Sequence, residues 1–81
     1  MPAKYKPISC HFYDELELLA IRQTSCPILY YNETNQQLAT TDIIVDFKII
    51  NHAEFMLLKS GLQIRLDRII SVDGKELAGY C

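Results

Sequence analysis

Three carboxylates and one tyrosine are crowded into a short segment near the start of this 81-residue chain. Tyr13, Asp14, Glu15 and Glu17 lie at the beginning of an expected helix. Neighbouring carboxylates can perform acid–base chemistry when they are buried against one another. On an exposed helical turn the same groups remain hydrated, or they bind a positively charged partner. The segment alone leaves all three interpretations open.

The other reactive side chains do not complete a catalytic or metal site. His11 and His52 are the only two histidines, whereas a metal site requires three or four converging ligands. A nucleophilic Cys10 would need a positioned base, and His11 is too close in sequence to serve. We therefore interpret Cys10 as a small buried residue and expect no enzymatic activity, cofactor, metal or small-molecule substrate.

The composition is typical of one small globular domain. Apolar residues make up 49% of the chain and charged residues 22%, which argues against disorder. We expect a single domain over residues 1–81, with residues 1–9 as an extended arm because prolines disfavour helix there. The net charge is −2 and the lysines and arginines are scattered. This distribution lacks the basic surface that nucleic-acid binding usually requires.

Cysteine usage and hydropathy indicate the compartment. Cys10, Cys26 and Cys81 have no close spacing, so a secreted disulfide scaffold is disfavoured. We expect Cys26 to lie in the core and Cys81 to be exposed. No stretch approaches the roughly 18 apolar residues that span a bilayer, and the opening residues lack the apolar run of a signal peptide. We expect a cytoplasmic protein that does not associate with membranes.

A helix is expected from His11 to Gln23, with Ser9 as its N-cap. Asp14 is the alternative cap if the helix begins later. Asp14 and Glu17 are three residues apart and therefore share a face that points to water. The apolar face of the helix is made of Phe12, Leu16 and Leu19. The competing interpretation is a strand over residues 16–21.

Short apolar and alternating segments predict about five strands after residue 25. Polar or glycine-containing turns separate them, with His52 as a solvated turn residue. Within residues 42–50 we expect one apolar side, made of Ile43, Val45, Phe47 and Ile49. This spacing favours a small antiparallel barrel or sandwich capped by the helix. The expected strands cover residues 26–31, 36–41, 53–59, 62–67 and 68–72, with the alternating segment over residues 42–50 between the second and third of them.

Three blocks of sequence resemble one known protein family. The opening block is Tyr5-x-Pro7-Ile8-x-Cys10-x-x-Tyr13-Asp14-x-Leu16-Glu17-Leu18. The second block is Leu38-Ala39 followed by Asp42, and the third is Glu54-Phe55 followed by residues 64–71. Together they are similar to the Rof family, also called YaeO, which are bacterial Rho-binding antiterminators. The blocks fall in the family order and span most of the chain.

The resemblance implies a fold, a partner and a contact surface. The implied fold is Sm-like, with an N-terminal helix and a small, strongly bent, five-stranded antiparallel barrel. The implied partner is the transcription terminator Rho, a hexameric helicase whose RNA-binding N-terminal region the family blocks. The acidic helix region that makes this contact carries over to Tyr13, Asp14 and Glu17.

Two further contacts and one departure follow from the same resemblance. Glu15 is an additional expected contact, as is Lys48 from the segment 43–52, which is longer and more apolar than in the family. Phe12 stands where a family member is acidic. It is therefore expected to weaken the negative surface.

Two other functions stay open. An Sm-like RNA-binding regulatory module is the main alternative, since that fold often binds RNA and one of Tyr30 and Tyr31 could stack on a base. The lack of a basic patch argues against it. A small enzyme or metal protein is the third interpretation, and the poor supply of converging functional groups argues against that one. We expect a protein partner, Rho, and no direct binding to nucleic acid.

Overall fold

The structure is a computed structural model that describes residues 6–77. Residues 1–5 of the expected arm and the terminal Cys81 lie outside the described residues. Residues 6–9 lead into the helix without regular structure, as expected. The regular elements are α1 (Cys10–Arg22), β1 (Ser25–Tyr31), β2 (Gln37–Ile50), β3 (Ala53–Leu58), β4 (Gln63–Arg65), a 3-10 helix (Leu66–Arg68), β5 (Ile69–Val72) and β6 (Lys75–Glu76).

Local sequence signals define both ends of α1. The Ser9 hydroxyl accepts a hydrogen bond from the His11 backbone N–H at 3.2 Å, which satisfies one of the free donors at the helix start. Gln23 adopts left-handed geometry and its N–H donates to the Ala20 carbonyl, which ends the helix. The predicted helix and its Ser9 cap are confirmed, and the alternative strand is wrong.

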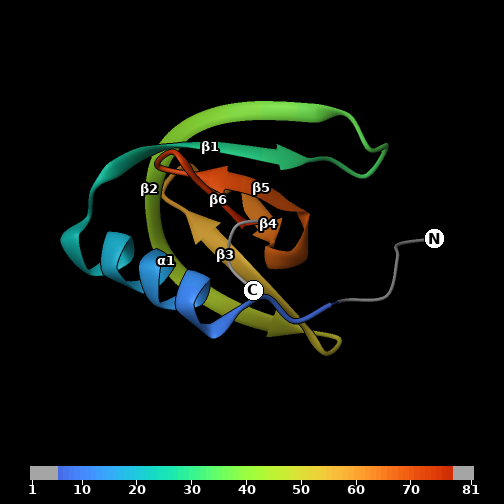
Figure 1. The fold of residues 1–81 in the computed structure, drawn as a ribbon, viewed down its shortest axis with the longest axis horizontal. Coiled ribbons are helices and arrows are strands. Elements are labelled where there is room, and N and C mark those ends of the chain that lie inside the picture. Colours follow the sequence, from blue (N-terminus) through green and yellow to red (C-terminus); the bar gives the residue numbers. More distant parts are fainter. Residues whose placement is uncertain (1–5, 78–81) are drawn as a thin grey trace.

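Six antiparallel strands form one sheet in the order β4-β3-β2-β1-β5-β6. The 14-residue strand β2 pairs with β1 through residues 37–43 and with β3 through residues 44–50. A β-bulge between Ile44 and Asp46 bends the strand between these two halves. Figure 1 shows β2 curving around one side of the molecule, with α1 beside its second half.

The mainly β architecture is as predicted, but the strand count and the closure differ. Among the described residues no ladder joins β4 to β6, so the sheet is open and not a closed barrel. A sixth strand forms because Asp73 and Gly74 adopt positive φ angles and return the chain to pair with β5. The expected strand over residues 62–67 is shorter, since Leu66 already begins a 3-10 turn.

The bulge in β2 also changes which side chains point inward. Ile44 is fully buried, whereas Val45 is 48% exposed and Ile49 is 74% exposed. The predicted apolar side is therefore wrong at Val45, while Phe47 packs against the core as predicted and Ile49, on the face of Phe47, is exposed. Strict alternation fails because two residues on the bulged strand oppose one on its partner.

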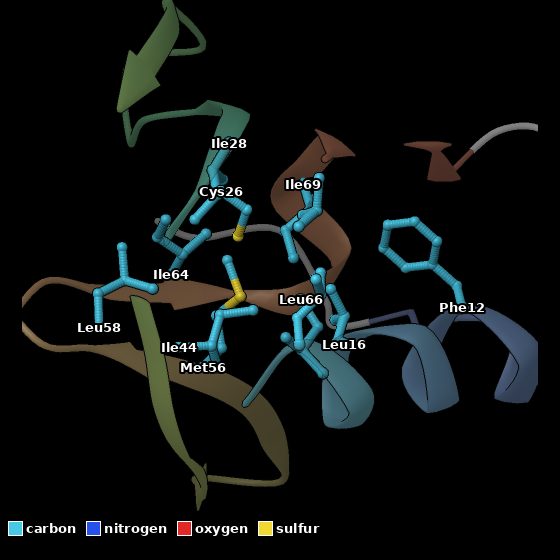
Figure 2. Close-up of a cluster of buried hydrophobic side chains, with 12 residues drawn as sticks. Phe12, Leu16, Cys26, Ile28, Ile44, Met56, Leu58, Ile64, Leu66 and Ile69 are labelled. Atoms are coloured by element: carbon cyan, nitrogen blue, oxygen red, sulfur yellow. The ribbon is translucent and has the colours of Figure 1, made fainter. Parts of the chain in front are cut away.

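The core lies between α1 and the concave side of the bent sheet (Figure 2). Cys26 is buried there, as predicted. Cys10 is exposed, so its predicted burial is wrong. It precedes Phe12 by two residues, which places the two side chains on roughly opposite sides of the helix. The fully buried larger side chains include Phe12, Leu16, Ile28, Ile44, Met56, Leu58, Leu66 and Val72.

Polar contacts hold the turns against this framework. The Asp42 carboxylate accepts hydrogen bonds from the backbone N–H groups of Ile43 at 2.7 Å and Ser60 at 3.2 Å. These contacts attach the β3–β4 turn to the bend of β2. Arg68 donates to the Asn32 carbonyl at 2.7 Å and to the Asn35 side chain, and its guanidinium lies over the Tyr31 ring. Arg68 thereby secures the β1–β2 turn.

No helix among residues 6–77 has both the length and the apolar character needed to cross a membrane.

Candidate protein-binding surface

Tyr13 lies at the junction of the helix and the sheet. Its ring packs on Phe47 of β2, with the ring centroids 5.0 Å apart and the planes tilted by 37°. The ring is partly buried against the edge of the core. This contact fixes the first turns of α1 beside the second half of β2. Tyr13 is therefore held in place by packing and presents its remaining surface to solvent.

The charges of three carboxylates from three different elements act on the Tyr13 hydroxyl. Burial raises the pKa of Tyr13, and the negative charges of Glu54, Glu17 and Asp46 raise it further. Glu17 comes from α1, Asp46 from β2 and Glu54 from β3. We call Tyr13, Glu17, Asp46 and Glu54 the Tyr13 cluster. A phenol whose ionisation is opposed by three acids marks a region of negative potential.

The predicted pair Asp14 and Glu17 is confirmed as an exposed face of the helix. The two side chains are about 60° apart around the helix axis because they are three residues apart. Glu17 joins the Tyr13 cluster, and Asp14 extends the negative surface away from the sheet.

Glu15 points elsewhere. Its carboxylate accepts a hydrogen bond from the Lys75 ammonium of β6 at 2.7 Å. Glu15 and Glu17 are two residues apart and so lie on roughly opposite sides of α1. The structure therefore separates Glu15 from the Tyr13 cluster and gives it an internal cationic partner.

Lys48 also lies apart from the Tyr13 cluster. It follows Phe47 in β2 and pairs with Phe55 across the ladder, while Phe47 pairs with the buried Met56. Successive side chains of a strand point to opposite faces, so Lys48 and Asp46 both lie on the face opposite Phe47, and Asp46 influences Tyr13 through its charge. Of the predicted contacts, the structure brings Tyr13 and Glu17 together with Asp14 beside them.

Phe12 does not belong to this surface. Its side chain is fully buried in the core, one residue before Tyr13 and on a different side of the helix. The expectation that Phe12 weakens the negative surface is therefore wrong. The residue at this position packs the helix onto the sheet instead of lining the exposed face.

Asp46 and Glu54 are members of the cluster that the sequence did not indicate. Both lie in strands, at least 29 residues after Glu17 in the sequence. Their approach to Tyr13 depends on the bulge in β2 and on the side of the sheet that α1 covers. The predicted turn at residues 51–52 is consistent with Glu54 lying beside the end of β2. No sequence signal indicated that α1 packs next to this part of the sheet.

The chemistry available on this surface is recognition of positive charge. Carboxylates accept strong charge-assisted hydrogen bonds from lysine and arginine, and a tyrosine ring offers a face for cation–π contact. Among residues 6–77, no three His, Cys, Asp or Glu side chains are grouped so as to hold a metal ion. His11 and His52 are both exposed, and His52 lies in a turn as predicted.

Comparisons with protein-family models, with curated proteins and with solved structures found no match to this chain.

Proposed function

We propose that this protein inhibits Rho-dependent transcription termination. In this proposal it binds the RNA-binding N-terminal region of Rho and blocks RNA loading. The observation that carries the proposal is the Tyr13 cluster, in which one aromatic ring packed on β2 feels the negative charges of acids from α1, β2 and β3. The choice of Rho rests on the resemblance of the three sequence blocks to the Rof family.

The physical basis is competition for the same cationic groups. A protein site that binds polyanionic RNA presents arginine and lysine side chains. A fixed group of carboxylates can occupy those side chains in place of phosphate. Long-range attraction speeds the encounter, while the Tyr13 ring contributes short-range contact. Screening operates over about 8 Å at physiological ionic strength, so binding should weaken as salt is raised.

The same proposal includes an Sm-like relationship for the fold and a cytoplasmic location in bacteria. The strongly bent β2, shared between β1 and β3, supports the fold assignment, as does the single helix that precedes the sheet. Under this proposal the protein acts through protein–protein contact, without a cofactor and without binding RNA itself.

The test is a pull-down of purified Rho with a charge-reversed double variant, Asp14→Lys with Glu17→Lys. Both positions are exposed, so the variant should fold, which circular dichroism can verify. The matched control is Glu33→Lys with Glu76→Lys, which makes the same change of net charge at two exposed positions outside the Tyr13 cluster.

We expect the first double variant to lose Rho binding and the control to retain most of it. Equal loss in both variants would mean that only the overall charge matters. Undiminished binding by the folded Asp14 and Glu17 variant would exclude the helix surface as the binding site.

A further inference from the structure

An exposed isoleucine stands beside the Tyr13 cluster. Ile49 is 74% exposed, and among the described residues only Ile21, at 77%, is a comparably exposed large apolar side chain. Single exposed apolar residues are common on protein surfaces. Ile49 differs from such isolated residues because an aromatic residue and a carboxylate lie next to it.

The register of the β2–β3 ladder places Ile49 next to the acids. Ile49 and Phe47 are two residues apart in β2, so they share a face and are about 6.5–7 Å apart along the strand. Phe47 carries the Tyr13 ring. Across the ladder Ile49 is directly opposite Glu54, at a typical Cβ separation of about 4.5–5.5 Å. The exposed aliphatic group therefore lies next to Phe47, on which the Tyr13 ring packs, and opposite the carboxylate of Glu54.

The backbone holds Ile49 in position before any partner arrives. The ladder continues past it to the pair Ile50–Ala53, and the hairpin closes through Asn51 and His52, both with positive φ angles. Two-residue turns of this kind match the twist of paired strands. A side chain held in a short hairpin loses little conformational freedom on binding, which favours a large contribution to affinity.

We propose that Ile49 is the apolar anchor of this docking surface, and that the surface takes a basic protein segment in which an aliphatic residue is flanked by arginines. The inference rests on the proposed function for the choice of site and specifies the chemistry of the partner. Charge complementarity selects this occupant, because Ile49 lies opposite Glu54 and close to a tyrosine whose pKa is raised by negative charges, which matches an aliphatic residue bordered by cations. Such central apolar contacts surrounded by polar groups dominate the affinity of many interfaces.

The experiment uses the full chain labelled with ¹⁵N and two synthetic peptides. Each peptide has three arginines on either side of one central residue, which is leucine in the first and serine in the second. We expect the leucine peptide to bind at least about fivefold more tightly, as the burial of one aliphatic group implies. Its amide shifts should centre on Tyr13, Ile49 and Glu54.

Two matched variants locate the anchor. Ile49→Thr keeps a β-branched side chain suited to the strand and removes the exposed apolar group. Ile21→Thr makes the same change at an equally exposed position in the last turn of α1, eight residues or about 12 Å along the helix from Tyr13. We expect the preference for leucine to disappear in the Ile49 variant and to persist in the Ile21 variant.

Three results would overturn the inference: equal binding of the two peptides, binding of neither, or a leucine preference that survives Ile49→Thr in a folded protein. Rho is titrated in parallel. A leucine preference that depends on Ile49, without Rho binding, would reject the proposed function and keep the anchor. Rho binding that is unchanged by Ile49→Thr, with no peptide preference, would reject the anchor and keep the proposed function.

Discussion

Replacing Phe12 with aspartate distinguishes a surface role for this residue from a core role. The resemblance to the Rof family places an acidic residue at this position, so Phe12→Asp would be expected to strengthen the negative surface. In the structure Phe12 is fully buried and belongs to the core between α1 and the sheet. The same substitution therefore inserts a carboxylate into apolar surroundings.

The expected loss of stability is comparable to the total free energy of unfolding of the chain. Truncating a buried phenylalanine costs about 3–5 kcal/mol. A carboxylate left in its place adds several kcal/mol unless it is protonated. A chain of this length has a total free energy of unfolding of about 4–12 kcal/mol. Phe12→Asp should therefore be largely unfolded at pH 7.

Circular dichroism, urea denaturation and an amide NMR spectrum at pH 7 measure the outcome. Cys10→Asp is the matched control, because Cys10 is exposed in the same turn of α1 and gains the same charge. A negative charge at a helix start is favourable by about 0.3–1 kcal/mol, so this control should be at least as stable as the parent. A folded Phe12→Asp protein with an unchanged urea midpoint would refute the assignment of Phe12 to the core.

Three further predictions concern the contacts that hold the fold and the cluster. Hydrogen bonds from Ser60 and Ile43 lower the pKa of Asp42 below its usual value of 3.8, so the stability that Asp42 supplies is present above that pH. It should be lost as the pH falls through the folded-state pKa, and the difference in urea midpoint between the parent and Asp42→Ala should shrink in acid. Arg68→Ala should lower the free energy of unfolding by about 2–4 kcal/mol, because it removes hydrogen bonds from a charged group and a cation–π contact. Glu54→Gln should lower the raised pKa of Tyr13, which a ¹³C NMR titration of the tyrosine rings can follow, whereas Glu33→Gln should leave it unchanged.

Each of these predictions has a contrary outcome. A midpoint difference for Asp42→Ala that does not change with pH would show that its carboxylate is not the group that titrates. A loss below about 0.5 kcal/mol for Arg68→Ala, the range of ordinary surface substitutions, would mean that the β1–β2 turn does not depend on it. An unchanged Tyr13 titration in Glu54→Gln would place Glu54 outside the cluster.

Local signals predicted the parts of the fold that depend on neighbouring residues. The Ser9 cap and the apolar face with Phe12, Leu16 and Leu19 lie within one helix, so spacing alone identified them. The bulge at Ile44 and Asp46 depends on how β2 pairs with β3, and no property of residues 42–50 by themselves specifies it. The exposure of Val45 was missed for that reason.

The candidate site shows the same division. Tyr13, Asp14 and Glu17 lie within one helical segment and were identified from the sequence. Asp46 and Glu54 reach Tyr13 only through the tertiary packing of Phe47. Glu15 was grouped with its neighbours in sequence, but rotation around the helix takes it to Lys75. Sequence proximity on a helix does not by itself place side chains on one surface.

Displacement of RNA from Rho tests the central proposal most directly. A fluorescent single-stranded RNA bound to Rho would be titrated with this protein while the anisotropy of the RNA is measured. We predict full displacement by the parent chain and by the Glu33 and Glu76 control, and none by the Asp14 and Glu17 variant. The contrary result is an anisotropy that stays high while this protein is bound to Rho, or one that rises when the chain is added to RNA without Rho.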